Sequence, residues 1–104
     1  MIIHDITDEN FNENIGEGIV LIDFFATWCG PCKMLTVEID ELVKINKEVK
    51  VVKVDVDKCG ITAMKYGVMS VPTLILYKNG EKLDSKTGYM PSSAIDSWIK
   101  ELVK

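Results

Sequence analysis

The chain has 104 residues, of which 47% are hydrophobic, and this length allows one domain with its own packed core. It carries 16 acidic and 12 basic side chains, a net charge of −4, and all of its basic residues are lysines. An acidic surface without arginine is a poor match for a phosphate backbone, which disfavours nucleic-acid binding. No apolar stretch approaches the ~20 residues that cross a bilayer, and the N-terminus lacks the features of a signal peptide. We therefore expect one cytoplasmic domain over residues 1–104 that does not bind a membrane.

The first quarter of the chain predicts a first strand, with His4 at its start, then a short helix and a buried strand. Thr7 or Asp8 can cap the helix, in which Phe11 and Ile15 lie on one face. The nearly continuous apolar run at 19–26 (IVLIDFFA) is typical of a central strand covered on both faces.

The middle of the chain predicts a long helix, a strand and a short helix. From Pro31 the apolar residues follow a helical period, and proline suits the first turn of a helix. The stripe on this helix is formed by Leu35, Ile39, Leu42 and Val43. The β-branched run at 51–56 predicts the strand, and residues 61–66 predict the short helix, which ends at Gly67.

The C-terminal third predicts a hairpin and a final helix. Residues 73–77 form a strand pattern, and Asn79-Gly80 is a strong signal for a two-residue turn into a strand at 81–87. A last helix opens near Pro91, with a buried stripe of Ile95, Trp98, Ile99 and Leu102. The order β-α-β-α-β-α-β-β-α indicates an α/β fold. Its alternating elements predict parallel strand pairs and its hairpin an antiparallel pair, so the sheet is mixed.

Two thiols stand one helical turn apart in Cys29-Gly30-Pro31-Cys32, between the apolar strand and the long helix. A thiolate is the form that attacks a disulfide. Cys29 falls at the helix N-terminus, where free N–H groups and the helix dipole favour negative charge, and Lys33 adds a positive charge nearby. Cys32 is then placed to attack a mixed disulfide formed at Cys29. The pattern indicates a redox pair.

Two other roles for these cysteines fit the sequence less well. A structural zinc site needs four ligands, and the only further candidates, Cys59 and His4, do not stand at ligand spacing. Simple packing of the thiols conflicts with the polar, turn-forming residues around them. A structural disulfide is improbable in an intracellular protein. We expect no metal.

Asp23 interrupts the buried strand pattern. A carboxylate inside a strand covered on both faces is costly to ionise, so its pKa would be raised, and it could exchange a proton with Cys32. Lys53, in the neighbouring strand pattern, is a plausible partner. An aspartate exposed at the end or edge of the strand explains the sequence equally well, and both alternatives stay open here.

These features together closely resemble the thioredoxin family, and the resemblance covers essentially the whole chain. A lone Cys-x-x-Cys would be weak support, whereas an ordered set of motifs is specific. The matching segments are Trp28–Cys32, the preceding Ile22–Phe24, Lys53, Val71–Thr73, Lys78–Gly80 and Gly88.

The resemblance implies a thioredoxin fold, with a central five-stranded mixed sheet flanked by four helices. It implies that Cys29 is the exposed nucleophile, Cys32 the resolving thiol and Asp23 the buried acid–base group beside Lys53. A cis Pro72 would face the dithiol. The residues implied to bind an extended substrate segment are Val71, through its backbone, and Trp28, Gly30, Pro31 and Gly88, as a flat apolar surface.

The function implied is that of a general protein-disulfide reductase, a monomer that uses no cofactor beyond its own disulfide. Its partners would be disulfide-containing target proteins and a thioredoxin reductase, either an NADPH-dependent flavin enzyme or a ferredoxin-linked one. The Gly-Pro pair between the cysteines supports a reductant. Two alternatives remain: a dedicated reductant for one partner, and a binding module in which redox chemistry is incidental.

Several positions carry smaller expectations. Val37 replaces a proline that commonly kinks the active-site helix in the family, so a straighter helix is expected, and Phe25 replaces a tryptophan. Cys59 is either a regulatory thiol or, more simply, an incidental surface or half-buried cysteine. Trp98 should belong to the core, and Met69 is a candidate for the border of the substrate surface.

Overall fold

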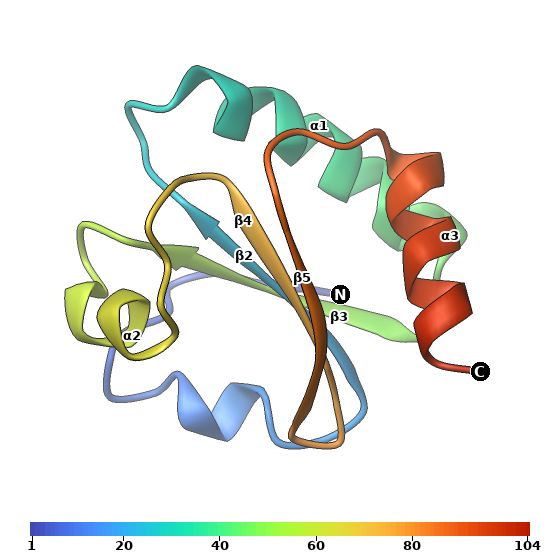
Figure 1. Cartoon of the computed structure of the whole chain (residues 1–104), viewed down its shortest axis with the longest axis horizontal. Coiled ribbons are helices and arrows are strands. Elements are labelled where there is room, and N and C mark those ends of the chain that lie inside the picture. The colour runs from blue at the N-terminus through green and yellow to red at the C-terminus, as the bar shows by residue number, and fades with distance from the viewer.

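A five-stranded mixed sheet runs through the protein, as seen in a computed structural model that describes all residues from Met1 to Lys104 (Figure 1). Its strands lie in the order β1-β3-β2-β4-β5. The strands are β1 (Ile2–Ile3), β2 (Ile19–Phe25), β3 (Val49–Asp55), β4 (Thr73–Lys78) and β5 (Glu81–Thr87). The helices are α1 (Gly30–Ile45), α2 (Gly60–Lys65) and α3 (Ser92–Leu102), with a 3-10 turn η1 (Asn12–Asn14) before β2.

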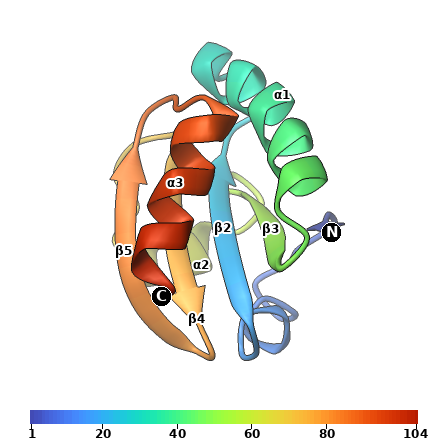
Figure 2. The ribbon, with the colours of Figure 1, turned by 90° about the vertical axis from the view of Figure 1, so that its right-hand side faces the viewer.

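The helices cover both faces of the sheet (Figures 1 and 2). The long helices α1 and α3 pack on one face, over a core that includes Leu21 of β2 and Leu74 of β4. The N-terminal segment and α2 cover the other face, where Phe11 and Phe24 are fully buried. β2 is therefore apolar on both sides because both of its sides are covered, as its sequence predicted.

The predicted strands and the three later helices are confirmed, with boundaries that differ by at most a few residues. At the hairpin, Asn79 and Gly80 both have positive φ (49° and 84°), the geometry of a tight turn between antiparallel strands. The first predicted helix is wrong, because the segment forms only the three-residue turn η1. Asn10, Asn12 and Asn14 have low helix propensity, and Gly16 and Gly18 follow directly, so the structure has three α-helices rather than four.

The direction of β4 also differs from the simple alternation rule. β1, β3 and β2 are mutually parallel, but β4 runs antiparallel to β2. The connecting helix α2 has six residues and spans about 9 Å, whereas a seven-residue strand spans about 23 Å. Since α2 is too short to carry the chain back along the sheet, β4 starts at the end where β3 stops.

No helix of the protein is both long enough and apolar enough to cross a membrane.

Candidate active site

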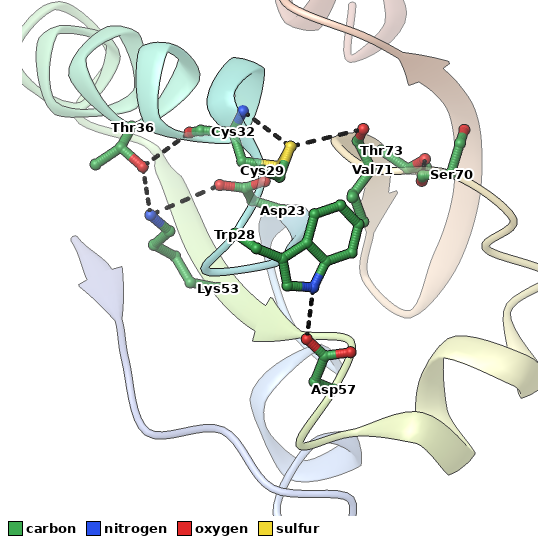
Figure 3. Close-up of a disulfide and its surroundings, with 10 residues drawn as sticks. All are labelled: Asp23, Trp28, Cys29, Cys32, Thr36, Lys53, Asp57, Ser70, Val71 and Thr73. Carbon is green, nitrogen blue, oxygen red and sulfur yellow. Dashed lines mark hydrogen bonds and ion pairs between the residues drawn. A yellow bond between two sulfur atoms is a disulfide. The ribbon is translucent and has the colours of Figure 1, made fainter.

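The two cysteines of the dithiol form a disulfide at the N-terminus of α1 (Figure 3). Cys29 is the N-cap residue, and its Sγ accepts a hydrogen bond from the backbone N–H of Cys32 at 3.2 Å. Pro31 occupies the first turn, where a missing N–H leaves no helical hydrogen bond unmade. An N-cap sulfur that accepts from the helix backbone is placed to carry negative charge.

Both cysteines are more covered than the resemblance implied. Cys29 is 5% exposed and Cys32 is 3% exposed, so the expectation of an exposed Cys29 is wrong for this disulfide form. The two residues pack with Ala26 and are covered from the sides by residues that include Phe25 and Val71. Cys29 Sγ also lies 3.8 Å from the Val71 carbonyl oxygen.

Asp23 is buried inside the sheet and is not an exposed aspartate at the end or edge of the strand. It is 1% exposed, its Oδ1 has no hydrogen-bond partner, and its Oδ2 lies 3.9 Å from Lys53 Nζ. Burial raises the pKa of Asp23 to about 6, although the nearby Lys53 ammonium acts to lower it. A carboxyl group with this pKa can both take and give a proton near neutral pH.

Lys53 lies next to Asp23 because β2 and β3 pair in parallel with these two residues in register. Its ammonium donates a hydrogen bond to Thr36 Oγ1 on α1 at 2.9 Å and lies 4.9 Å from the centroid of the Phe25 ring. Thr36 Oγ1 in turn donates to the Cys32 carbonyl oxygen at 3.1 Å. The charged pair is thereby connected to the first turn of the helix that carries the cysteines.

The loop before β4 forms the other side of the site. The Val71–Pro72 peptide bond is cis, and Pro72 is buried. The Pro72 carbonyl accepts a hydrogen bond from the Gly88 N–H at 2.9 Å, which joins this loop to the end of β5. Gly88 has φ +93°, a conformation that side-chain-bearing residues rarely adopt.

Trp28 forms an exposed wall of the site. Its side chain is 70% exposed, and its indole Nε1 donates to Asp57 Oδ2 at 3.0 Å, which fixes the direction of the ring (Figure 3). A pocket of about 170 Å³ between Trp28 and the loop before β4 is lined mainly by apolar side chains, including Met69 and Val71. Met69 therefore lines the apolar pocket beside Trp28.

Comparisons with known proteins agree with this geometry. The sequence model of the family "Thioredoxin" matches residues 2–101. The chain belongs to the thioredoxin family. It is 43% identical over 102 residues to the thioredoxin of Bacillus subtilis, an alignment that covers 97% of this chain and 98% of the relative. It is 48% identical over 92 residues to that of Staphylococcus haemolyticus, covering 88% of each chain. It is 39% identical to that of Rickettsia prowazekii, covering 97% and 99%.

Thioredoxins are thiol–disulfide oxidoreductases, and so is this chain, with the Cys29–Cys32 disulfide as its redox group. Its His, Cys, Asp and Glu side chains form no group of three or more that could hold a metal ion.

The structure shows where two residues that depart from the family pattern lie. Val37 is exposed in the interior of α1, which runs unbroken from Gly30 to Ile45. Phe25 stands where many thioredoxins have tryptophan, and its ring lies beside the Lys53 ammonium. Such a contact between a cation and an aromatic face is favourable.

Sequence reasoning missed two polar residues of the site, Thr36 and Asp57. Thr36 lies four residues after Cys32, so the helical period was a signal that could have placed it beside the dithiol. Asp57 lies in the turn after β3, and nothing in its local sequence indicates a partner on another loop. Cys59 was expected at the surface or half-buried, but it is fully buried, and its thiol donates to the Ile6 carbonyl at 3.2 Å.

Proposed function

We propose that this thioredoxin reduces disulfides of other proteins, with Cys29 as the nucleophile and Cys32 as the resolving thiol. The observation that carries the proposal is the N-cap position of Cys29, whose sulfur accepts a hydrogen bond from the helix backbone. The same environment stabilises a thiolate once the disulfide is reduced. Cys32 lies inside the first turn of α1, one helical turn after Cys29, which suits the second step.

The reaction consists of two thiol–disulfide exchanges. The Cys29 thiolate attacks one sulfur of the target disulfide, so a Cys29–target bond forms and the target S–S bond breaks. The other target sulfur leaves as a thiolate and takes a proton. Cys32, as a thiolate, then attacks Cys29, which closes the Cys29–Cys32 bond and releases the second target thiolate, which is also protonated. The target gains two electrons, and the two cysteines lose them.

Asp23 is proposed as the base that removes the Cys32 proton before the second step. Its carboxyl group has a pKa of about 6, so it is mostly ionised at pH 7 and can accept a proton without a large energy cost. Lys53 is proposed to limit the rise in the pKa of Asp23, so that the carboxyl group is ionised and ready to accept a proton at neutral pH. Replacing Asp23 by asparagine should therefore slow the release of the target from the mixed disulfide.

The target is proposed to dock across the loop before β4 and the exposed surface beside the disulfide. The Val71 backbone would pair with an extended target segment, and the cis Pro72 would face the dithiol. The surface residues are Trp28, Gly30, Pro31 and Gly88. Beside this docking surface, the apolar pocket next to Trp28 offers a place for a nonpolar side chain of the target.

The wider setting of this activity is also a proposal. We propose that residues 1–104 act as one domain, as a monomer, in the cytoplasm, without a bound cofactor. A thioredoxin reductase would return two electrons to the disulfide after each turnover. Either an NADPH-dependent flavin reductase or a ferredoxin-linked one fits these residues.

The test is reduction of insulin disulfides, followed by trapping of targets. The wild-type protein coupled to a thioredoxin reductase should reduce insulin catalytically, and the absence of turnover would reject the proposal. Cys32→Ser should accumulate a covalent mixed disulfide with target proteins, whereas Cys29→Ser should not. Trapping by Cys29→Ser alone would reverse the two roles. Capture of many targets supports a general reductase, and capture of one indicates a dedicated reductant.

A further inference from the structure

Thr36 connects the charged pair of the site to the cysteine helix. Lys53 Nζ donates to the Thr36 hydroxyl oxygen at 2.9 Å, and that hydroxyl donates to the Cys32 carbonyl oxygen at 3.1 Å. A threonine inside a helix commonly donates to the carbonyl four residues earlier. This bond fixes the hydroxyl and leaves a lone pair directed away from the helix, where the Lys53 ammonium meets it (Figure 3).

The ammonium is held short of the Asp23 carboxylate. Its nitrogen lies 3.9 Å from Asp23 Oδ2, whereas a charge-assisted hydrogen bond between such groups has a length of about 2.7–2.9 Å. The second carboxylate oxygen, Oδ1, is buried and has no partner. Asp23 thus has a cation beside it but no hydrogen bond to its carboxylate.

We propose that Thr36 is a positioning residue for thiol–disulfide exchange: its hydroxyl holds the Lys53 ammonium away from direct contact with Asp23 and so keeps Asp23 able to take the proton of Cys32. The proposal rests on the function proposed above. The Thr36 hydroxyl bonds the Cys32 carbonyl oxygen and the Lys53 ammonium, and neither cysteine sulfur. Its effect on the reaction is therefore exerted by way of Lys53.

The surroundings of Asp23 leave Lys53 as its main charged neighbour. On β4 the residue paired with Asp23 is the apolar Leu74. On α1 the titratable and charged groups at this end are Cys29, Cys32 and Lys33, and Lys33 is exposed. On β3 they are Lys53 and Asp55. Burial is the main cause of the raised pKa of Asp23, and Lys53 is the one charge that acts against it, so a change in the position of this ammonium changes the readiness of Asp23 to bind a proton.

An opening to solvent lies beside this network. A cavity of about 230 Å³ is lined by residues that include Cys32, Thr36 and Lys53. Water in such an opening can exchange protons with the site. The opening also gives the Lys53 ammonium freedom to move when its bond to Thr36 is lost.

The experiment compares Thr36→Val, which removes the hydroxyl with little change of shape, with Thr36→Ser, which keeps it. The pKa of Asp23 is measured by NMR titration of its carboxyl carbon in the oxidised protein. In Thr36→Val the ammonium should move to the nearest remaining acceptor, the Asp23 carboxylate, and lower the pKa of Asp23 by about one unit. Thr36→Ser should match the wild type. The pH profile of mixed-disulfide resolution should move to lower pH by the same amount in Thr36→Val only.

A double-variant cycle ties the effect to Lys53. In a Lys53→Gln background, Thr36→Val should leave the pKa of Asp23 unchanged. An unchanged or raised pKa in Thr36→Val, an equal shift in Thr36→Ser, or a shift that persists without Lys53 would each overturn the proposal. If Thr36→Val does not fold, Thr36→Ala serves as the hydroxyl deletion. Because the titration requires no turnover, failure to reduce insulin would reject the proposed function separately from this inference.

Discussion

At the scale of single residues, the buried carboxyl group of Asp23 couples chemistry to stability. The group is fully buried, and its pKa is raised to about 6 by desolvation, against 3.8 in an exposed aspartate. The folded state therefore binds a proton more tightly than the unfolded state. Stability falls as pH rises from about 4 to about 6, where the unfolded chain is ionised and the folded one is not, and it stays reduced above that range.

Asp23→Asn should therefore be more stable than the wild type at neutral pH. A difference of about 2 pKa units corresponds to ~3 kcal/mol in the free energy of unfolding, as an upper limit. The gain should be complete at pH 7 and mostly lost near pH 4, where the carboxyl group is protonated in the folded state and about half protonated in the unfolded chain. Urea denaturation of the oxidised protein between pH 4 and pH 8 measures it. Asp40→Asn, on the exposed side of α1, is the matched control and should show no such dependence. A gain that is constant with pH would contradict this explanation.

Cys59 is the residue whose burial decides between the two interpretations of its thiol. It is 0% exposed, and burial is the main cause that raises its pKa, with the carboxylates of Asp8, Asp55 and Glu9 adding to the effect. A thiol with a raised pKa and no access to solvent reacts slowly, because the thiolate is the reactive form.

The folded, oxidised protein should thus resist labelling at Cys59. With Cys29 and Cys32 joined, Cys59 is the free thiol that DTNB can label. In the folded protein the reaction should release less than about one-tenth of an equivalent of thionitrobenzoate per chain within minutes. After unfolding in guanidinium chloride it should release about one equivalent. Rapid labelling of the folded form would restore the interpretation of Cys59 as a regulatory thiol.

At the scale of elements, two helices are capped by carboxylates from distant segments. The N-cap residues Cys59 of α2 and Pro91 of α3 make no side-chain capping bond. Instead Asp8 Oδ1 accepts from the Thr62 N–H at 2.8 Å and from its hydroxyl at 2.6 Å, and Glu38 accepts from the Ser92 N–H at 2.7 Å. An acidic group at a helix N-terminus satisfies free N–H groups and complements the helix dipole.

Removal of the Asp8 cap should loosen α2 selectively. The hydrogen bonds from Thr62 lower the pKa of Asp8, so its contribution to stability is present above the unfolded pKa and is lost as pH falls through the lowered value. In Asp8→Ala, amide hydrogen exchange at neutral pH should become several-fold faster in α2 than in the wild type. Glu9→Ala, at an exposed neighbour, should leave these rates unchanged. An equal acceleration in both variants would show that the effect does not come from the cap.

The same elements show what the sequence could predict. β2, α1 and the hairpin were predicted well because an apolar run, a helical stripe and Asn79-Gly80 are local signals. The distant caps were not, because no local pattern connects Asp8 with Thr62. Thr7 does cap a turn, through its hydroxyl and the Asn10 N–H, but that turn does not continue as an α-helix.

Within the candidate site, the dithiol could be predicted from its spacing and from its place between a buried strand and a helix, but the contacts that support it could not. The burial of Asp23 depends on strands that pair across the sheet, and its sequence context allowed two outcomes. The bond between Trp28 and Asp57 depends on where two loops meet. Such contacts follow from the assembled fold. The helical period could place Thr36 beside Cys32, but its bond to Lys53 and the bond between Trp28 and Asp57 were found only in the structure.

At the scale of the whole molecule, the protection of backbone amides against hydrogen exchange is expected to differ between the centre and the edge of the sheet. β2 pairs on both sides and is buried under helices on both faces, whereas β5 is an edge strand with mostly exposed side chains. Backbone amides open most rarely where pairing and burial are both complete.

Native-state hydrogen exchange should follow this order. Amides at the centre of β2 and of its neighbours β3 and β4 should exchange only through global unfolding, with a denaturant dependence equal to that of the whole protein. Amides of β5 should exchange at least tenfold faster, through local opening. Equal protection of β5 and β2 would contradict the role assigned to the covered centre of the sheet.

The shortness of α2 gives the molecule two ends with different roles. Because β4 begins where β3 stops, the disulfide, the loop before β4 and the end of β5 gather at one end of the sheet. At the opposite end, the hairpin residue Asn79 binds Gly18, and the Lys78 ammonium donates to the carbonyl of Val103 near the C-terminus. A label, surface tether or fused protein attached at the C-terminus would therefore leave the disulfide facing away from it, open to incoming partners.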